Sequence, residues 1–463
     1  MKNNLNKTIV LVITCLASFL TPFMSSALNV ALPTISQQFM LTAILSSWVV
    51  SAYLLATAIF LVPFGKIADI YGRKKIFLLG IIIYTISSTL IGLIKTAPVF
   101  ILLRIMQGLG SAMIFTTSVA IITSVFPAGE RGKYLGINVA VTYLGLSSGP
   151  FIGGVLTEYL SWRSIFFVNG ILGLIILILT VGYLKKLEWQ EYQSKRIDYV
   201  GATIYSLGLL SLIYGLTIIT KPLGFILIPI GVVLIVIFVL WEAKVTNPIL
   251  DVNLFRQNIT FAFSNLAAGI NYSATFGVGY LLSLYLQHLK KLTASQTGLV
   301  LITQPIMMAI LSPLAGKISD KIEARITASI GMAITFGALL ILIFLKIDTP
   351  LLSIVLNLSM LGIGLAIFSS PNMNAIMSSV NKEYYGIASG TLATMRLIGQ
   401  MFSMAIVMLV TSLFMRNIKI GYENYPLFLK SSSTIFLIYA LLCFGGIFAS
   451  LARGKLKSAE NRR

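Results

Sequence analysis

The sequence predicts an all-α membrane protein in which two six-helix bundles flank an inserted helix pair, giving fourteen transmembrane helices. Hydrophobic residues make up 57% of the chain and charged residues only 10%, whereas soluble domains are about a quarter charged. Apolar runs long enough to span a bilayer recur along the whole chain, and one loop sequence occurs twice, once in each half. This composition excludes an ordinary soluble protein.

Each membrane-spanning helix needs about 20 mostly apolar residues. Fourteen runs of about this length occur, and their even number places both termini on the same side of the membrane. The first run follows a basic start as in a secretory signal, but it has no small-residue cleavage site and is expected to remain as the first helix. The runs lie near residues 8–31, 45–64, 76–94, 98–122, 134–157, 165–184, 200–219, 224–241, 259–286, 296–315, 327–346, 351–370, 387–414 and 434–451.

The basic residues that give the net charge of +20 lie mainly in the short loops between the apolar runs. With the N-terminus taken as cytoplasmic, 23 of the 34 lysines and arginines fall in cytoplasmic segments and 9 in external segments. An excess of basic residues marks the cytoplasmic loops of membrane proteins. We therefore expect a multi-pass protein of the cell (inner) membrane with both termini in the cytoplasm, surrounded by the lipid bilayer and without a nucleic-acid partner.

The repeated loop reads PFGKIADIYGRKK at Pro63–Lys75 and PLAGKISDKIEAR at Pro313–Arg325. Each copy follows the second helix of its half. This repeat predicts an N-terminal six-helix bundle over residues 1–184, cytoplasmic linker segments with an inserted helix pair over 185–258, and a C-terminal six-helix bundle with a basic tail over 259–463. Two such halves are expected to surround a central cavity with the solute site near the midplane.

The first copy of the loop contains residues suited to a gate, namely Gly65, Asp69, Gly72 and Arg73. The glycines permit close backbone approach and a tight turn. Asp69 is expected at the start of the third helix, where it can pair with Arg73. Such a charge clamp at the cytoplasmic mouth would hold one conformation closed. The alternative is a short hairpin whose basic residues only set the topology.

In the fourth run, the sequence LLRIMQGLG places Arg104 inside an apolar segment and Gln107 three residues later. An ionisable residue inside the membrane is costly and therefore indicates a functional site. The alternative is that the side chain reaches the outer interface, because Arg104 lies only about 9 Å from the start of the run at 1.5 Å per residue. Gln107 and the glycine beside it favour an arginine that faces the bundle interior.

The fifth run contains the small-residue stretch GLSSGPFIGG, with Gly145, Gly149, Pro150 and Gly153. Glycines let two membrane helices touch, and a proline bends a helix. Ordinary small-residue packing would account for the glycines alone. The matching helix of the second half, Gly386–Ile406, has no Gly-Pro pair, and this asymmetry indicates a role beyond packing.

Polar and aromatic residues inside the runs are candidates for lining the cavity. Each one alone is more readily explained by a hydrogen bond between helices, but together they predict a mostly apolar cavity suited to amphipathic ligands. We also include the embedded arginine of the thirteenth run. The candidates are Ser25, Ser26, Asn29, Trp48, Tyr53, Asn271, Tyr272, Gln304, Asn372, Asn374, Arg396 and Gln400.

The sequence offers no pattern for a metal site, a cofactor or a catalytic centre. Cys15 and Cys443 both fall inside apolar runs, and His288 is the only histidine. A membrane enzyme would need a cluster of catalytic groups. We therefore expect neither an enzyme nor a cofactor.

Together the motifs resemble those of the major facilitator superfamily, in particular its fourteen-spanner drug:proton antiporter branch of multidrug efflux proteins. The loop at 65–75 is similar to the superfamily's signature loop, the stretch at 102–110 to its helix-four motif, and 145–154 to its antiporter motif. Further stretches similar to that branch are Asn29–Pro33 (NVALP), Trp48–Tyr53 (WVVSAY), Ser161–Asn169 (SWRSIFFVN) and Glu242–Phe255 (EAKVTNPILDVNLF).

The resemblance implies twelve core helices, a central drug-binding cavity, and export of a small amphipathic substrate by alternating access, driven by protons as the coupling ion. Arg104 would take part in proton coupling, and the protein is expected to be a monomer. An exporter of one endogenous metabolite, lipid or peptide-like compound would share all of these motifs. A sensor with this fold would normally add a soluble domain, for which no loop is long enough.

The chain departs from that branch at one position, because Met24 stands where the branch usually has an aspartate. All fourteen acidic residues are expected away from the membrane midplane, so Arg104 and Arg396 are the only embedded charges. Like charges repel strongly at low dielectric. We therefore expect the cavity to accept neutral, zwitterionic or anionic amphipaths more readily than permanent cations, and a peripheral acid such as Asp69 or Glu158 to carry the proton.

The predicted topology places both copies of the repeated loop in the cytoplasm. In a variant without other cysteines, Tyr71→Cys and Glu323→Cys are expected to react with a membrane-impermeant thiol reagent only after the cells are permeabilised. Labelling of either position in intact cells would contradict the fourteen-helix topology.

Overall fold

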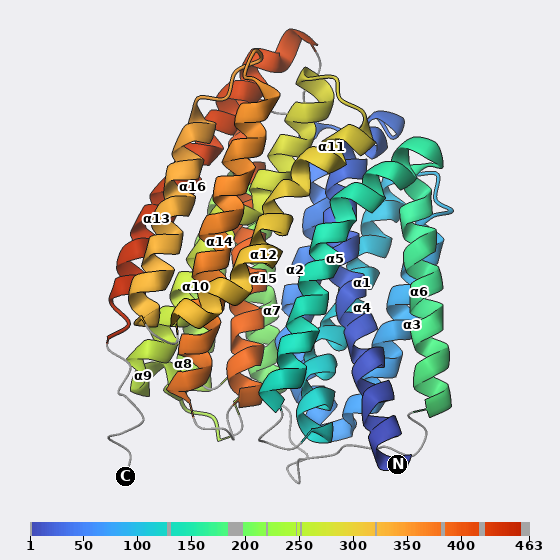
Figure 1. Ribbon diagram of the computed structural model, residues 1–463, viewed down its shortest axis with the longest axis vertical. Coiled ribbons are helices and arrows are strands. Elements are labelled where there is room, and N and C mark those ends of the chain that lie inside the picture. Colours follow the sequence, from blue (N-terminus) through green and yellow to red (C-terminus); the bar gives the residue numbers. More distant parts are fainter. Residues whose placement is uncertain are drawn as a thin grey trace. The chain divides into compact units, whose positions relative to one another are not determined.

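The computed structural model describes residues 2–126, 131–183, 198–218, 221–246, 248–250, 252–319, 322–380, 385–415 and 422–454. Every regular element in these ranges is a helix (Figure 1). The first half comprises α1 (Lys2–Gln38), α2 (Ala43–Tyr71), α3 (Arg73–Ile91), α4 (Ala97–Val125), α5 (Arg131–Tyr159) and α6 (Trp162–Tyr183), followed by α7 (Tyr199–Thr217) and α8 (Pro222–Glu242). The second half comprises α9 (Val252–Gln257), α10 (Ile259–Leu284), the π-helix η1 (Tyr285–Leu289), α11 (Ala294–Leu301), α12 (Thr303–Ser319), α13 (Ala324–Ile343), α14 (Leu351–Ser379), α15 (Tyr385–Phe414), the 3₁₀-helix η3 (Tyr422–Asn424) and α16 (Tyr425–Leu451).

Within the described residues, 12 helical segments are long and apolar enough to cross a membrane. The prediction of an all-α, multi-pass membrane protein is therefore confirmed. Two of the predicted spans, near 134–157 and 259–286, are not among these segments, although α5 and α10 occupy them with 29 and 26 residues. The many glycine, serine, threonine and asparagine residues of α10 lower its hydropathy, and several side chains of α5 lie outside the described residues. The count of fourteen spans therefore stays a prediction.

The predicted span near 296–315 consists of two consecutive helices, α11 and α12, with Ile302 between them. Pro305 explains this break. It has no N–H to donate to the carbonyl of Leu301, and its ring clashes with that carbonyl. The two helices together still form one segment, Ala294–Gly316, that is long enough to cross a bilayer.

The chain forms two compact units, and the first consists of Met1–Leu250, Gly279–Ile302 and Met404–Phe428. In this unit α1 packs against α4, α5 and α6, while α4 also packs against α2 and α3. The helices α3 and α4 approach closely at two glycines, since a methyl group on Gly110 would lie 2.8 Å from the carbonyl oxygen of Gly80. Small residues are typical of such contacts, because lipid supplies no hydrophobic force that drives helices together.

The second unit consists of Asp251–Val278, Thr303–Ser403 and Leu429–Arg463, and in it α12 and α13 pack against α14. The pair α13 and α14 repeats the contact of α3 and α4. A methyl group on Gly331 would lie 2.7 Å from the carbonyl oxygen of Gly364. Because α3 and α13 each follow one copy of the repeated loop, the same packing occurs at equivalent places of the two repeats. The predicted division at residues 184 and 258 stays a prediction.

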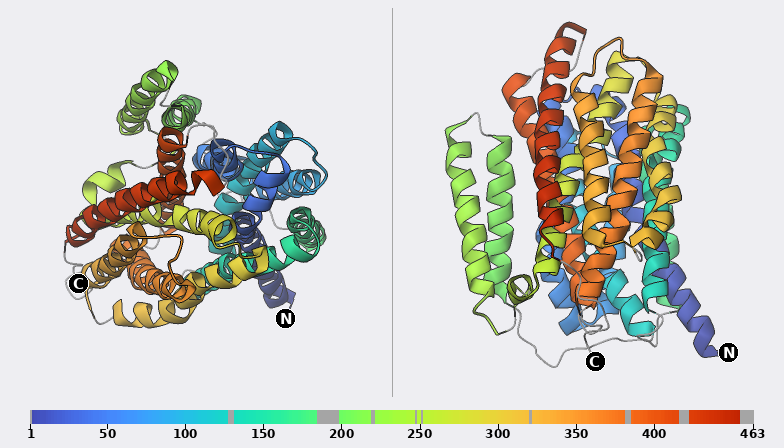
Figure 2. Two further views of the ribbon diagram at one scale, coloured as in Figure 1. Left: turned by 90° about the horizontal axis from the view of Figure 1, so that it is seen from above. Right: turned by 60° about the vertical axis from the view of Figure 1, so that its left-hand side comes forward.

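The inserted pair is formed by α7 and α8, which lie side by side in the first unit (Figure 2). The hydroxyl of Tyr205 on α7 donates to the carbonyl of Ala58 on α2 (3.1 Å). Asp198 caps α7 by accepting from the backbone N–H of Gly201 (2.8 Å), and its other oxygen accepts from the indole of Trp241 on α8 (2.7 Å). These bonds hold the pair together and attach it to α2.

Candidate functional site

The predicted gate loop spans the junction of α2 and α3. The expected position of Asp69 at the start of the third helix is wrong, because nothing interrupts α2 before Gly72 and Asp69 lies in its last turn. Gly72 has a φ of 107°, which glycine adopts readily. Gly65 has no such requirement, since an added methyl group would make an ordinary contact 3.7 Å from Thr116.

Arg73, the first residue of α3, is buried and anchors that end of the helix to α4. Its guanidinium donates to the carbonyl of Ala120 (3.1 Å) and to the hydroxyl of Ser124. The side chain of Asp69 lies outside the described residues, so its pairing with Arg73 stays a prediction. The described contacts show that Arg73 does more than contribute loop charge.

Arg104 on α4 is completely buried and is held by neutral groups. Its Nε donates to the carbonyl of Val49 on α2 (3.0 Å), and its Nη1 donates to the amide oxygen of Gln107. Gln107 in turn donates to the hydroxyl of Ser88 on α3 (2.7 Å). The guanidinium carbon lies 4.3 Å from the centre of the Tyr53 ring, a cation–π contact. The network therefore joins three helices around one positive charge.

The burial of Arg104 shows that its side chain lies in the bundle and does not extend to the outer interface. Its Nη2 is buried and has no hydrogen-bond partner among the described residues. The hydroxyl of Tyr53 forms a 2.7 Å hydrogen bond with the hydroxyl of Ser111, which holds the ring beside Arg104. Arg104, Gln107 and Tyr53 are candidates predicted from the sequence, whereas Ser88 and Ser111 are not, because serines are common in membrane helices.

The glycines of α5 lie along one face that contacts α1. A methyl group on Gly145 would lie 2.6 Å from the carbonyl oxygen of Phe19, and one on Gly153 would lie 2.7 Å from Cα of Ala27. The contact is tightest at Gly149, where the methyl group would lie 1.8 Å from the hydroxyl of Ser26. That hydroxyl bonds to the carbonyl of Pro22 in its own helix (2.9 Å). The backbones of α1 and α5 therefore touch over two turns.

The same segment of α5 also contacts α11. A methyl group on Gly298 would lie 2.1 Å from the carbonyl oxygen of Pro150, and one on Gly154 would lie 2.6 Å from the carbonyl oxygen of Ala294. Near the end of α5, the carboxylate of Glu158 accepts from the backbone N–H of Ser295 (2.9 Å) in the first turn of α11. This second contact was not predicted, because no sequence motif links the two stretches.

The remaining candidates of the first unit lie on α1 and α2. Ser25 is half-buried. The side-chain amide oxygen of Asn29 is buried and has no partner among the described residues. The backbone carbonyl of Asn29 accepts from the hydroxyl of Ser283 (2.6 Å). The ring of Trp48 lies 6.2 Å from that of Tyr214 on α7. Trp48 therefore packs toward the inserted pair.

In the second unit, four candidates lie on α10 and α15. Asn271 is completely buried, and neither its amide nitrogen nor its oxygen has a partner among the described residues. The guanidinium carbon of Arg396 lies 6.0 Å from the centre of the neighbouring Tyr272 ring. Gln400 follows one turn later on α15 and is half-buried. A buried amide without partners is unfavourable, so Asn271 is available to a water molecule or a solute.

The other candidates of the second unit lie on α12 and α14. Gln304 is half-buried. Asn372 is buried, and its amide oxygen has no partner among the residues described. Asn374 is exposed and donates to the hydroxyl of Ser319 (3.2 Å). This bond joins the ends of α12 and α14.

Within the described part of the chain, no group of three or more histidine, cysteine, aspartate or glutamate side chains is placed to hold a metal ion. Cys15 and Cys443 are buried free thiols. In η1, burial and the nearby Lys291 lower the pKa of His288. His288 is therefore neutral at physiological pH.

Comparison with known proteins shows similarity to one large family of transporters. The family model described as Major Facilitator Superfamily matches residues 14–404, and a second match covers residues 264–457. The chain is 33% identical over 393 residues to the riboflavin transporter RibZ of Clostridioides difficile (strain 630), covering 84% of this chain and 85% of that protein. It is 31% identical over 411 residues to the multidrug resistance protein Stp of Mycobacterium tuberculosis (strain CDC 1551 / Oshkosh), covering 87% of this chain and 75% of that protein.

The fold is also similar to that of solved transporters. One of them is a bacterial homologue of the human lysosomal transporter Spinster, in an inward-facing and unoccupied conformation. The TM-score is 0.67, with 15% sequence identity over 98% of this chain and 99% of that one.

The contact at Gly149 is expected to tolerate no side chain. Gly149→Ala should lower the free energy of unfolding by about 1–3 kcal/mol, the usual cost of overpacking, because the methyl group would overlap Ser26. The measurement is the thermal unfolding of the purified protein. Gly182→Ala is the matched control, since a methyl group there meets no atom within 4 Å. Equal unfolding temperatures for the two variants would show that the α1–α5 contact is not close.

Proposed function

The chain belongs to the major facilitator superfamily, and on that premise we propose that it exports small amphipathic compounds as a multidrug efflux protein, by proton-coupled antiport and alternating access. We place it in the fourteen-spanner drug:proton antiporter branch. In this proposal the protein is a monomer in the cell (inner) membrane, and both termini are cytoplasmic.

The burial of Arg104 is the observation that carries this proposal. A charge inside a membrane bundle is costly and is retained where it serves transport. Arg104 is surrounded by Val49, Gln107 and Tyr53, which are neutral groups, and no described carboxylate pairs with it. Its Nη2, which has no partner among the described residues, can donate to water or to a transported solute.

Glu158 is our candidate for the proton carrier among the peripheral acids. It links α5 to α11 through its bond to the N–H of Ser295. A carboxylate accepts this bond more strongly than a protonated carboxyl group does, and its negative charge is stabilising near a helix N-terminus such as that of α11. Protonation of Glu158 would therefore loosen the α5–α11 contact and couple proton binding to movement. Asp69 remains the other candidate.

The charges of the described residues support a preference against permanent cations. Arg104 and Arg396 lie well inside α4 and α15, whereas the described acidic side chains lie at or beyond helix ends. These acids are Glu158, Asp198, Glu242, Glu323, Asp348 and Glu423. Cationic substrates would meet repulsion that none of the described carboxylates offsets from the interior.

Transport of one particular compound is the second candidate function. It is favoured by the similarity to RibZ, whose name gives riboflavin as its substrate. Riboflavin is a largely neutral amphipath, so it also fits the charge preference proposed above. The polar groups without partners, Asn271 and Asn372, are suited to hydrogen-bonding a defined solute.

A compound panel separates the two functions. Multidrug efflux predicts that deletion raises, and overexpression lowers, susceptibility to several unrelated neutral, zwitterionic or anionic drugs, with little change for a quaternary ammonium dye. A shift confined to one compound, or rescue of a riboflavin auxotroph by uptake, would favour the second function. A large shift for the dye alone would contradict the charge argument.

Arg104→Lys tests proton coupling. Lysine keeps the charge, but it is a point donor that cannot reproduce the fork held by Val49 and Gln107. In proteoliposomes with an imposed pH gradient, Arg104→Lys should lose most of the proton-driven transport while folding normally. The control is Arg256→Lys, at an exposed arginine on α9, which should transport as the parent does. Full activity of Arg104→Lys would show that proton coupling does not need the guanidinium and its hydrogen bonds to Val49 and Gln107.

A further inference from the structure

Arg453 lies two residues beyond the end of α16, and only 1% of its surface is exposed. Its backbone carbonyl accepts from the hydroxyl of Thr260 (2.9 Å), and its Nη2 donates to the hydroxyl of Ser450 (2.9 Å). Its Nε and Nη1 are buried and have no hydrogen-bond partner among the described residues. Buried charged donors are normally satisfied, so Nε and Nη1 of this guanidinium still lack acceptors among the described residues.

The guanidinium of Arg453 carries its charge at neutral pH. Burial lowers its pKa to about 10, which still leaves the protonated form dominant. One nearby ring, that of Phe368, lies 6.0 Å from the guanidinium carbon. A ring at this distance offsets only a small part of the cost of burying the charge.

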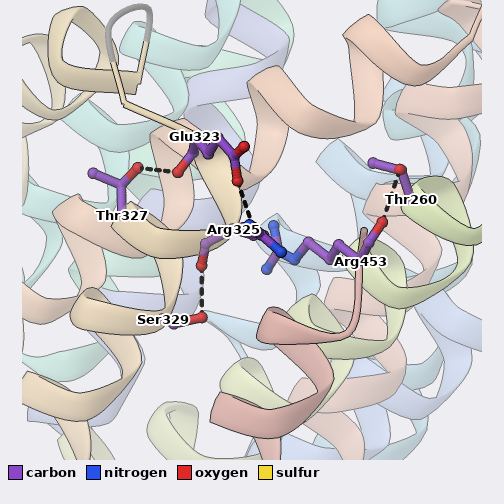
Figure 3. A network of polar contacts seen from close by, with 6 residues as sticks. All are labelled: Thr260, Glu323, Arg325, Thr327, Ser329 and Arg453. Atoms are coloured by element: carbon purple, nitrogen blue, oxygen red, sulfur yellow. Dashed lines mark hydrogen bonds and ion pairs between the residues drawn. The ribbon is translucent and has the colours of Figure 1, made fainter. Parts of the chain in front are cut away.

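Arg453 lines a small hollow at the protein surface, and a second arginine lines the same hollow. Arg325, in the first turn of α13, points toward Arg453 (Figure 3). Its Nε pairs with the carboxylate of Glu323, and the two side chains are 30% and 38% exposed. Glu323 thus provides one negative charge, already bound to Arg325, against two guanidinium groups. The hollow between them is lined further by Thr260, Ala324 and Ala375.

The start of α13 adds a weaker attraction for anions. Glu323 is the N-cap residue, but its side chain makes no hydrogen bond to the backbone of the first turn. The N–H groups of a helix start carry partial positive charge and bind anions. They lie at the same hollow as the two arginines, because Ala324 and Arg325 line it.

We propose that this hollow, formed by Thr260, Glu323, Arg325 and Arg453, binds a phosphate group, either from the headgroup of an anionic membrane lipid or as free phosphate. The guanidinium fork matches the geometry of phosphate oxygens. The cavity volume beside the residues is ≈ 10 Å³, about the space that one oxygen-sized group needs. One phosphate oxygen therefore enters between the arginines, and the rest of the group lies at the opening.

The place of the hollow in the fold favours the lipid as the source. It lies where the apolar segment Ala324–Ile343 begins and just beyond the end of the apolar segment Tyr425–Leu451. Headgroups occupy this level of a bilayer, and basic pockets between helix ends bind anionic ones. A lipid phosphate in the hollow would join the starts of α10 and α13 to the end of α16.

The test uses the purified full-length protein, stripped of lipid in a neutral detergent. Phosphatidylglycerol, phosphatidylcholine and inorganic phosphate are titrated separately at constant ionic strength. Binding is read by native mass spectrometry and by the shift in unfolding temperature. The variants are Arg325→Gln, Arg453→Gln and Arg453→Lys, with Arg256→Gln as the matched control at an exposed arginine.

We expect one tightly held phosphatidylglycerol per protein, and about tenfold weaker binding in Arg325→Gln, which loses one charged hydrogen-bonding partner of the phosphate. Arg453→Lys should fold and bind more weakly than the parent, while Arg256→Gln binds normally. Equal stabilisation by inorganic phosphate would support the site with free phosphate as its ligand. Equal binding of phosphatidylcholine, or phosphatidylglycerol binding unchanged in Arg325→Gln and Arg453→Lys, would overturn the proposal. Arg325→Gln keeps the test valid even if Arg453→Gln fails to fold.

Discussion

Direct contact between helix backbones is the constraint on which this structure depends. In a bilayer, lipid tails are as apolar as leucine side chains, so association relies on close packing and on hydrogen bonds. Gly80 with Gly110, and Gly331 with Gly364, remove the side chains that would separate α3 from α4 and α13 from α14. At Gly149 the distance is too short for any side chain. The polar groups described above are positioned by these contacts.

The buried arginines illustrate two different solutions to the cost of charge in an apolar environment. Arg104 shares its charge with a carbonyl, an amide and an aromatic ring drawn from its own helix and its neighbour. These partners are neutral, so the positive field of the residue persists in the bundle. Arg453 donates to one hydroxyl, and among the described residues its Nε and Nη1 have no partner. The first arrangement is internal to the bundle, while in the second the proposed phosphate would supply the missing acceptors.

The sequence predicted those features that depend on local pattern. Long apolar runs predicted the helices, and Gln107 indicated correctly that Arg104 lies inside a bundle. The break at Ile302 followed from Pro305 but was not recognised within a continuous apolar run. Asp69 was misplaced because the repeated loop was taken to begin before Gly72. Contacts between distant stretches, such as Gly298 with Pro150, left no local pattern. Arg453 was assigned only to the basic tail, because its burial depends on Thr260, far away in the sequence.

The polar residues of α10 have a consequence for how the chain is made. A helix enters the bilayer from the translocation machinery according to its own transfer free energy, and polar residues near its centre oppose this step. Asn265 and Asn271 in α10 are buried among other helices in the folded protein, but during synthesis they would meet lipid alone. Insertion of α10 is therefore expected to be easier when helices made before it are already in place. The order in which the helices are made would then matter for the biogenesis of this protein.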